Sequence, residues 1–373
     1  MQFSQIPGLP DIKNRLISSV NNKHIAHAQL FFGSEGSASL PLALAYATYI
    51  NCENKLKTDS CGVCQSCSKY NKLIHPDLHF VYPVSTTKAV PKDALSTSFM
   101  KDWRKFLDHH PFGGINDWSA FIAAENKQLS ISVDEARNII KSLIMKSYEA
   151  EYKTLIIWLP EFMNLASANA ILKILEEPPA KTIFLLVTNN NEKIITTILS
   201  RTLKVRIPAF SEEEVKNHLV TFHEADEKKA SQLAWISEGN INEAIRLVKE
   251  VEEDNHEMFR EWMRACYRKN NIKDLVQWTE TFQTLGRESQ KSLLQYGLNI
   301  IRETLIFPHS ADLVKLQAED FKFVEGFSKV LSADKVEKIT SLLNEAHYHI
   351  ERNANAKITF LDVSLSLSSI LKT

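Results

Sequence analysis

Residues 28–40 of this 373-residue chain read AQLFFGSEGSASL, and this stretch decides the fold. A short apolar segment, 28–32, leads into a loop with two glycines, and a stretch of helical character follows from about residue 38 to 51. A strand that runs through a glycine-containing loop into a helix is the setting of a phosphate-binding P-loop. The stretch therefore predicts a P-loop-type α/β domain.

The chain continues to alternate strands and helices beyond this stretch. Apolar segments of strand length occur at 79–84, 153–160, 183–187 and 205–207, and helical patterns occur at 10–22, 132–143 and 166–177. The run 183–187 is continuously apolar, which is typical of a parallel strand covered on both faces. The alternation predicts a doubly wound α/β domain. Residues 86–128 show no clear period, and we interpret them as an insertion with one or two short helices.

After residue 208 the sequence predicts helices only. About three short helices fill 209–252, and longer amphipathic helices fill 253–373. The expected fold class is α/β plus all-α. The expected domains are an α/β domain at 1–208 that contains the cysteine cluster (52–67) and the insertion (86–128), a small helical domain at 209–252 and a C-terminal helical domain at 253–373.

Composition and charge exclude several classes of protein. The 44 Lys and Arg against 45 Asp and Glu give a net charge of −1, which excludes a uniformly basic nucleic-acid coat but not local contacts through Lys141 or Lys146. Hydrophobic residues at 44% exclude a mainly disordered chain. No apolar run approaches the ~18 residues of a membrane span, and charges from Asp11 onward interrupt the N-terminus. We therefore expect a cytoplasmic protein with no membrane association.

The loop departs from the P-loop pattern at the positions that carry its chemistry. The pattern requires glycine at its sixth position, then lysine, then serine or threonine, but Ala38, Ser39 and Leu40 stand there. The lysine that neutralises phosphates and the hydroxyl that holds Mg²⁺ are therefore missing. Amide donors at the helix start still allow weak anion binding, but we expect no ATP hydrolysis and no nucleotide cofactor. The degenerate loop positions are Gly33, Gly36, Ser37, Ala38, Ser39 and Leu40.

The acidic motif that completes such a site is also degenerate. Trp158 and Leu159 occupy the positions, after the strand at 153–160, where acidic residues would coordinate Mg²⁺ and polarise water. Glu161 lies beyond them, and we interpret it as a capping or surface acid. The alternative is that the glycines merely turn the chain, but their position between a strand and a helix favours a degenerate P-loop.

Four of the five cysteines form one cluster. Cys52, Cys61, Cys64 and Cys67 have the spacing C-x8-C-x2-C-x2-C, with Gly62 inside a Cys-x-x-Cys turn. Four thiolates suit a closed tetrahedral Zn²⁺ site of structural type. A redox pair and an iron–sulfur cluster are the alternatives. The fifth cysteine, Cys266, falls on an apolar helical face, where we expect a buried small side chain; we likewise expect Trp103 and Trp118 to be core residues.

Several motifs, taken in order, resemble a known family. They are Ile6-Pro7-Gly8, 27–31, the Gly33–Leu40 loop, the cysteine cluster, His75-Pro76-Asp77, 133–137, the string NAILKILEEPP at 169–179 and 197–201. This order is similar to that of the AAA+ clamp-loader subunits of bacterial DNA polymerase III. The resemblance covers residues 1–250, with a weaker echo at 351–355 in the helical tail. Because both nucleotide motifs are degenerate, the chain resembles the subunits that do not hydrolyse ATP rather than the gamma/tau ATPase.

The resemblance implies roles for particular residues. Ser200-Arg201-Thr202 resembles the family's Ser-Arg-Cys motif, whose arginine projects toward ATP on the next subunit. Arg201 is thus the expected trans arginine finger, with Ser200 beside it; the alternative is an ordinary surface arginine. Asn242 stands where the family's ATPases carry an arginine that contacts the γ-phosphate, and Thr188 or Asn189 would occupy the sensing position. Related subunits carry zinc where the cysteine cluster lies, which implies structural zinc here.

The resemblance also implies a function. The expected protein is a non-hydrolysing structural subunit of a sliding-clamp loader in DNA replication. Its partners would be the gamma/tau ATPase subunits and the delta subunit, and indirectly the sliding clamp and primer–template DNA. The C-terminal helices would join a collar between subunits. Two rivals are an active P-loop ATPase subunit, which ATP titration would reveal, and a zinc-bearing DNA-binding or scaffold protein outside any loader, which salt-dependent DNA affinity would reveal.

Overall fold

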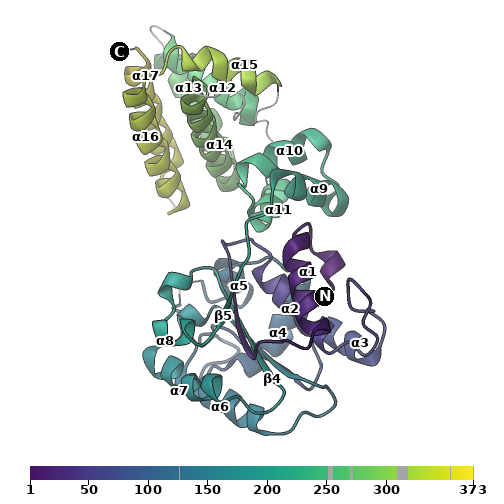
Figure 1. Ribbon diagram of the computed structural model, residues 1–373. Helices are drawn as coiled ribbons and strands as arrows, with labels where there is room; N and C mark the ends of the chain where they lie inside the picture. The colour runs from purple at the N-terminus through teal and green to yellow at the C-terminus, as the bar shows by residue number, and fades with distance from the viewer. Residues whose placement is uncertain (126, 251–254, 269–271, 309–317, 353, 373) are drawn as a thin grey trace. The chain divides into compact units, whose positions relative to one another are not determined.

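The chain divides into two compact units. A computed structural model describes residues 1–125, 127–250, 255–268, 272–308, 318–352 and 354–372. The first unit comprises Met1–His218 with Ser237–Glu243, and the second comprises Leu219–Ile236 with Ala244–Thr373 (Figure 1). The predicted boundaries at 208 and 252 remain predictions, and the second of them falls within 251–254, outside the described residues.

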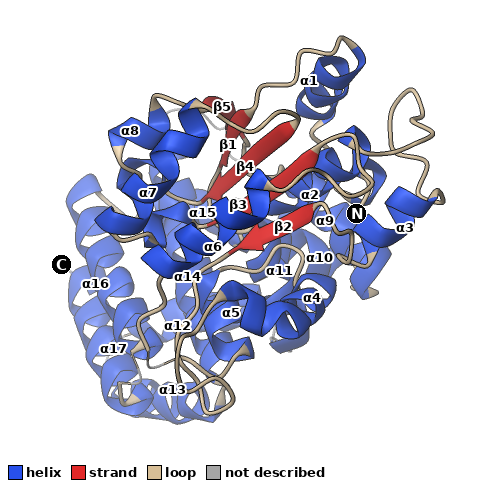
Figure 2. Cartoon of the chain, turned by 90° about the horizontal axis from the view of Figure 1, so that it is seen from below, coloured by secondary structure: helices blue, strands red, loops and turns tan. Residues whose placement is uncertain are grey.

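The first unit is built on a five-stranded parallel sheet, shown in red in Figure 2, with the strand order β2-β3-β4-β1-β5. The strands are β1 (Ala28–Phe32), β2 (Leu78–Val81), β3 (Lys153–Trp158), β4 (Thr182–Thr188) and β5 (Leu203–Arg206). In the pairing register, Leu30 of β1 lies between Leu186 of β4 and Lys204 of β5. The parallel sheet and its alternating helices confirm the expected P-loop-type α/β domain.

Helices and short 3-10 turns connect the strands of this unit. They are η1 (Phe3–Gln5), α1 (Pro10–Asn21), α2 (Ser39–Ile50), α3 (Gln65–Asn71), η2 (Ser96–Phe99), α4 (Met100–His109), α5 (Ile115–Phe121), α6 (Val133–Ile144), η3 (Pro160–Phe162), α7 (Leu165–Glu176), η4 (Asn191–Lys193) and α8 (Thr196–Leu199). Helices α9 (Glu212–His223) and α11 (Ile241–Glu250) have residues in both units.

Two predicted strands end earlier than expected. The predicted strand at 79–84 ends at Val81, and Val84 forms only an isolated antiparallel bridge with Ser130. Pro83 lies between them and has no N–H to donate to a ladder. The predicted strand at 153–160 ends at Trp158, because Leu159 takes a left-handed conformation with φ +55° before Pro160 opens η3.

Helices cover both faces of the sheet. Leu30, Leu155 and Leu186 face α6, α7 and α8 and form one apolar cluster with them. On the opposite face, the ring of Phe31 lies 6.1 Å from the ring of Tyr46 on α2. All twelve residues of α2 are buried, because this helix packs against β1, β3 and β4 and is also covered by α1. Both elements that flank the loop between β1 and α2 are therefore packed in the core of the first unit.

The insertion at 86–128 is a folded part of the first unit. Trp103 and Trp118 are fully buried, and the ring of Trp103 stacks on Tyr82 at 4.1 Å. The indole Nε1 of Trp118 donates a hydrogen bond to the Pro83 carbonyl oxygen at 2.8 Å. The carboxylate of Glu135 on α6 accepts hydrogen bonds from both the backbone N–H and the hydroxyl of Ser96. The expectation that both tryptophans are core residues is confirmed.

Side-chain caps define several helix starts. Ser132 accepts a hydrogen bond from the backbone N–H of Glu135 at the start of α6. Ser211 and Glu214 accept hydrogen bonds from each other's backbone N–H groups and form a capping box at the start of α9. The carboxylate of Asp77 accepts the backbone N–H groups of residues 148–150 and so fixes the loop before β3.

The second unit is helical throughout its described residues. Besides the shared α9 and α11 it contains α10 (Glu227–Ile236), α12 (Asn255–Tyr267), α13 (Ile272–Thr284), α14 (Arg287–Ile306), α15 (Ala318–Ser328), α16 (Ala333–Glu351) and α17 (Ala356–Lys372). Its core stacks Phe360 between Trp262 and Phe282, with ring centroids 4.5 and 3.9 Å away. Cys266 is buried beside Ser364, as predicted. The weaker motif at 351–355 includes residue 353, which lies outside the described residues.

Helix lengths and hydropathy bear on membrane contact. Within the part of the chain that the structure describes, no helix combines the length and the apolar character needed to cross a membrane.

Candidate functional site

The loop Gly33–Leu40 follows β1 and ends in the first turn of α2. A Cβ at Gly33 would lie 2.5 Å from the Ile207 carbonyl oxygen, and Gly36 has φ +72°, so both positions require glycine. The hydroxyl of Ser39 bonds that of Ser37 at 2.9 Å, and both serines are buried. A lysine at position 39 would reach bound phosphates, whereas the shorter Ser39 side chain bonds Ser37 within the same loop.

The other degenerate positions are buried among apolar side chains. Ala38 and Leu40 are 0% and 5% exposed, so neither offers a metal ligand to solvent. Trp158, at the end of β3, is also buried, and its ring lies 5.1 Å from the ring of Trp103 in the insertion. The position of the acidic motif is therefore filled by an aromatic core contact.

Glu161, interpreted from the sequence as a capping or surface acid, lies in the first turn of η3. It is half-buried, because η3 turns it toward the end of β4. Burial raises the pKa of its carboxyl. Hydrogen bonds from the Thr188 hydroxyl and nearby backbone N–H groups lower the pKa, but by less. It lines a cavity of about 490 Å³ together with Glu35, Asn189, Asn190 and Lys193, among others. Thr188 itself is fully buried, and its hydroxyl accepts the backbone N–H of Asn190. Of the two expected sensing positions, Asn189 therefore lines this cavity, whereas Thr188 lies buried at the end of β4.

Asn242 lies in the first turn of α11 and contacts the insertion. Its side-chain amide donates a hydrogen bond to a carboxylate oxygen of Asp117 at 2.8 Å. The residue that the sequence placed at the expected sensor position therefore bonds an acidic residue of the same chain. Nothing in the spacing of 86–128 distinguished Asp117, whose only local signal was a place near a helix start after Gly114.

Arg201 lies in the turn after α8 and is held by two elements. Its Nε donates to Oε1 of Glu176, the last residue of α7, at 2.7 Å, and a terminal nitrogen donates to the Thr197 carbonyl oxygen at 2.8 Å. The hydroxyl of Ser200 donates to the same carbonyl and lies 3.4 Å from the guanidinium. The Arg201 side chain remains 31% exposed, so the guanidinium is oriented without being enclosed.

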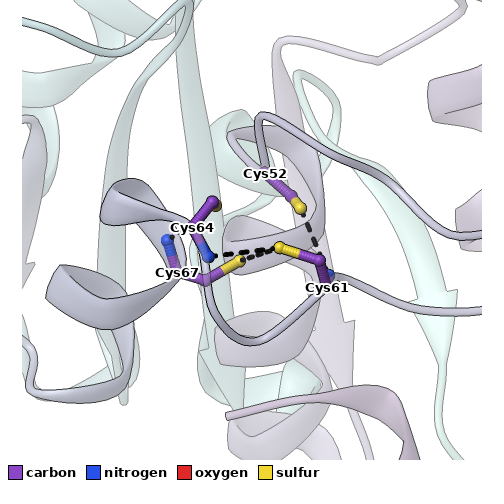
Figure 3. A group of neighbouring side chains, drawn as sticks. All are labelled: Cys52, Cys61, Cys64 and Cys67. Atoms are coloured by element: carbon purple, nitrogen blue, oxygen red, sulfur yellow. Dashed lines mark hydrogen bonds between the residues drawn. The ribbon is translucent and has the colours of Figure 1, made fainter.

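The four cysteines of the cluster converge, as Figure 3 shows. Cys52 follows α2, Cys61 lies in the intervening loop, and Cys64 and Cys67 lie at the start of α3. Their sulfur atoms all lie within 4.8 Å of one another, a set that could hold a metal ion. Gly62 has φ +74° and makes the tight turn between Cys61 and Cys64.

Backbone N–H groups point at the cysteine sulfurs. Those of Cys61, Cys64 and Cys67 each lie 3.3 Å from the sulfur of the preceding cysteine of the cluster. The backbone N–H groups of Cys64 and Val63 lower the pKa of Cys61 to about 6, which favours the thiolate. Thiolates in a closed, four-sulfur arrangement are the donor set of a structural zinc site.

The start of the chain is tied to the cysteine loop. The carboxylate of Asp59 accepts the backbone N–H groups of Phe3 and Ser4 at 3.0 and 2.9 Å, and the Gln2 side chain donates to the Ser60 carbonyl oxygen at 2.7 Å. The residues between the first and second cysteines therefore anchor η1, a connection that the cysteine spacing did not reveal.

The structure brings some predicted residues together and separates others. The degenerate loop, Trp158 and Asn189 meet at the carboxyl edge of the sheet, and Asn242 joins them through Asp117. Arg201 precedes β5, which runs parallel to β1 with Gln29 opposite Leu203. Arg201 therefore lies at the amino edge of the sheet, a strand length of about 15 Å from the loop after β1.

Fold and sequence together define a P-loop-type AAA+ protein whose loop departs from the P-loop pattern at Ala38, Ser39 and Leu40. Residues 8–211 match the family described as "DNA polymerase III, delta subunit". Because this match covers more than half of the chain, the chain belongs to that family and is a clamp-loader protein.

Individual relatives extend this result. The tau subunit of DNA polymerase III from Escherichia coli K12 is 26% identical over 254 residues, which are 67% of this chain and 33% of that protein. The delta' subunit from Pseudomonas aeruginosa is 24% identical over 183 residues, 49% of this chain and 43% of that protein. The chain thus spans about a third of the length of that tau subunit. A solved gamma subunit-related protein of Thermotoga maritima is 16% identical with a TM-score of 0.36, covering 95% of this chain and 99% of that one.

Proposed function

We propose that the chain is a non-hydrolysing subunit of the DNA polymerase III sliding-clamp loader, of the delta-prime type, and that it supplies Arg201 to ATP bound on a neighbouring subunit. Membership of the delta family and similarity to a delta' subunit support this proposal. The replacement of the chain's own nucleotide-contacting residues supports the non-hydrolysing role.

The position of Arg201 is the observation that carries the proposal. Arg201 precedes β5 at the amino edge of the sheet, whereas the loop Gly33–Leu40 follows β1 at the carboxyl edge. The guanidinium cannot reach across a strand length of about 15 Å to its own loop. An oriented, partly exposed arginine in this place suits a phosphate on another molecule.

The guanidinium has the chemistry that this role requires. Arginine is planar and carries several N–H donors that match phosphate oxygens. A trans arginine that neutralises charge in the transition state contributes about 10³–10⁵ in rate. In this chain Glu176 and the Thr197 carbonyl orient the guanidinium, and Ser200 lies beside it. Arg201 would therefore approach a neighbouring ATP in a defined geometry.

The chain's own loop lacks the groups that would make it an ATPase. Ser39 and Leu40 replace the lysine and the Mg²⁺-binding hydroxyl, and Trp158 replaces an acidic residue. None of these three side chains is positively charged or coordinates Mg²⁺ as a carboxylate does. We propose that ATP is neither held nor hydrolysed there.

Cys52, Cys61, Cys64 and Cys67 would hold one structural Zn²⁺. A bound zinc ion supplies cross-linking of the loop and no catalysis, because four thiolates leave no open position. The chain's part is to aim backbone N–H groups at the sulfurs and, through Asp59, to tie η1 to the loop.

The proposed partners follow from the proposed role. They are the gamma/tau ATPase subunits and the delta subunit, and indirectly the sliding clamp and primer–template DNA, in the cytoplasm. The helices of 253–373 would form the collar that joins the subunits, the α/β domain of 1–208 would present Arg201, and 209–252 would form the small helical domain. Similarity to DNA polymerase III subunits supports this assignment.

The decisive experiment measures ATPase activity of a reconstituted loader on primed DNA. Arg201→Ala should lower turnover to the level of an assembly from which this subunit is omitted, while assembly itself is retained in gel filtration. Arg137→Ala is the matched control, because Arg137 is a well-exposed arginine on α6 that pairs only with Asp134 among the described contacts. Unchanged turnover in Arg201→Ala would remove the proposed role of Arg201.

A second candidate is a gamma/tau-like ATPase subunit. The name of the Escherichia coli relative favours it. Calorimetric titration of the purified chain with ATP and Mg²⁺ separates the two candidates, since saturable binding with hydrolysis supports the ATPase and the absence of binding supports the structural subunit.

A further inference from the structure

We infer that the remnant nucleotide site is an internal binding surface, and that its occupant is the segment 111–117 of the chain's own insertion. The inference rests on the proposed function, because it describes what a non-hydrolysing subunit places where ATP would bind. It goes beyond the loss of catalytic residues, since it predicts a closed site even if those residues are restored.

The first observation is the space above the loop. Gly36, Ser37 and Ser39 of the loop line a cavity of only about 10 Å³. The opposite wall is formed by Pro111, Phe112 and Gly113 of the insertion. A single water needs about 10–15 Å³ by the same measure, so a phosphate group does not fit.

The second observation is the set of ring contacts made by Trp158 at the end of β3. Trp158, at the acidic-motif position, packs its ring 5.1 Å from Trp103 and 6.1 Å from Phe106 of α4. Helix α4 leads directly into the segment, and a Cβ at Gly113 would lie 2.7 Å from the ring of Phe106. Trp158, at the acidic-motif position, thus contacts the helix that leads into the segment and lines the same small cavity as Pro111, Phe112 and Gly113.

The third observation is a pair of hydrogen bonds that Asp117 accepts. One carboxylate oxygen of Asp117 accepts the backbone N–H of Gly114 at 2.7 Å and the side-chain amide of Asn242 at 2.8 Å. Gly114 also lies against the loop, since a Cβ there would be 1.9 Å from Oε1 of Glu35. The phosphate loop, the acidic-motif position and the lost sensor position therefore each contact the same insertion.

Charge at this place also disfavours a triphosphate. Burial raises the pKa of Glu35, and the nearby carboxylates of Asp117 and Glu243 raise it further. The loop has Ser39 at the lysine position, and Glu35, at its third position, lies near two other acids. These acids would repel a polyanion, and the closely packed segment Pro111–Gly114 is uncharged and offers no positive charge to offset the repulsion.

The segment is held from its outer side as well. Phe112 is 5% exposed, and its ring meets the rings of Phe210 and His218 edge-on at 5.7 Å. The insertion thereby contacts the loop, the end of β3 and three residues of the first unit, Phe210, His218 and Asn242. Side chains of the insertion make these contacts within the chain itself.

Hydrogen exchange of the full chain tests the inference. The first amides of α2, at Ser39 and Leu40, have no intrahelical partner, so their exchange reports whether the segment covers them. Asp117→Ala should raise exchange across residues 37–40 by about tenfold or more, with β4 unchanged. Asp108→Ala is the matched control, because Asp108 is exposed on α4 of the same insertion and should leave exchange at 37–40 unaltered.

A further variant keeps the result decisive. Phe112→Ala releases the outer contact and should have the same effect as Asp117→Ala, so it decides the case if that variant unfolds. Unchanged exchange at 37–40 in either variant, with β4 still protected, overturns the inference.

Restoring the loop provides an independent test. Ala38→Gly, Ser39→Lys and Leu40→Thr together recreate the P-loop pattern while the insertion is intact. This variant should show no saturable binding of a fluorescent ATP analogue with Mg²⁺ up to about 1 mM. Saturable binding would overturn the inference but would leave the role of Arg201, which the loader ATPase assay tests separately.

Discussion

Arg201 and Glu176 are joined by an ion pair in which Nε of the guanidinium donates to Oε1 of the carboxylate at 2.7 Å. Glu176 ends α7 and Arg201 follows α8, so the pair connects two helices that pack on the same face of the sheet. Both side chains are partly exposed, at 31% for Arg201 and 47% for Glu176. The pair orients the guanidinium while leaving it accessible.

We expect Glu176→Gln to lower the DNA-stimulated ATPase of the reconstituted loader several-fold, but less than Arg201→Ala does. Glutamine keeps the length of the side chain but loses the charge that aligns the guanidinium. Stability should hardly change, because an exposed pair contributes about 0.2–1 kcal/mol. Thermal unfolding of the isolated chain checks the second statement. An ATPase rate equal to that of the unaltered loader would show that Glu176 does not position Arg201.

Asp77 gives the protein an acid-sensitive contact. Burial alone would raise the pKa of Asp77, but the backbone N–H groups of Ala150, Glu149 and Tyr148 outweigh it and hold the pKa below its ordinary value. A carboxyl whose pKa is lowered on folding contributes its stability above its unfolded pKa of about 4, and this contribution is lost as the pH falls through the folded value.

The test for Asp77 is urea unfolding of the unaltered chain and of Asp77→Asn at several pH values. At pH 7 the substitution should cost about 2 kcal/mol, because hydrogen bonds to a charged group are lost. The difference between the two proteins should shrink as the pH falls below about 4. A difference that is independent of pH would show that the charge of Asp77 is not what stabilises the loop.

Metal analysis of the purified chain should find about one zinc per molecule. Removal of the metal with a strong chelator should speed amide exchange in the cysteine loop and also in residues 2–5, because Asp59 of that loop holds the backbone of Phe3 and Ser4. Cys64→Ser should lower the metal content, whereas Cys266→Ser is the control, since Cys266 lies outside the cluster. Full exchange protection of residues 2–5 after chelation would argue against this coupling.

The two insertion tryptophans form a matched pair for measuring one hydrogen bond. The indole N–H of Trp118 donates to the Pro83 carbonyl, whereas that of Trp103 has no acceptor among the described residues. Both Trp→Phe changes remove similar buried volume. Trp118→Phe should therefore be less stable than Trp103→Phe by about 1 kcal/mol in chemical denaturation. Equal losses would mean that the Trp118 bond adds no net stability.

The sheet was predictable because its signals are local. Each strand is a short apolar run, and the run at 183–187 identified a strand buried on both faces. The cysteine cluster was predictable for the same reason, since Cys61, Cys64 and Cys67 lie within one turn and a helix start. The ends of two strands were missed, at Pro83 and at Leu159, where a missing donor and a left-handed backbone decide the boundary.

The contacts of the insertion could not be predicted because they are long-range. Asp117 and Asn242 are 125 residues apart, and neither has a periodic neighbourhood that would pair them. The sequence indicated only that Trp158 stands where an acidic residue was expected. Its ring contact with Trp103 depends on how α4 packs against β3, which the sequence does not show. The sequence indicated a capping or surface acid at Glu161, but its partial burial against the end of β4 depends on a neighbouring strand and could not be predicted.

The strand order also determines when, during synthesis, β1 acquires its partner strands. The first strand made, β1, lies in the sheet between the last two, β4 and β5, so its partners are complete only when Arg206 has left the ribosome. At roughly 5–20 residues per second, the stretch from Phe32 to Arg206 takes on the order of 10–35 s to translate. Until β4 has been made, the apolar β1 has no strand partner, although α1 is synthesised before that interval and α2 and the cysteine loop early in it. The nascent chain would therefore depend on early helices, or on a chaperone, to cover its central strand.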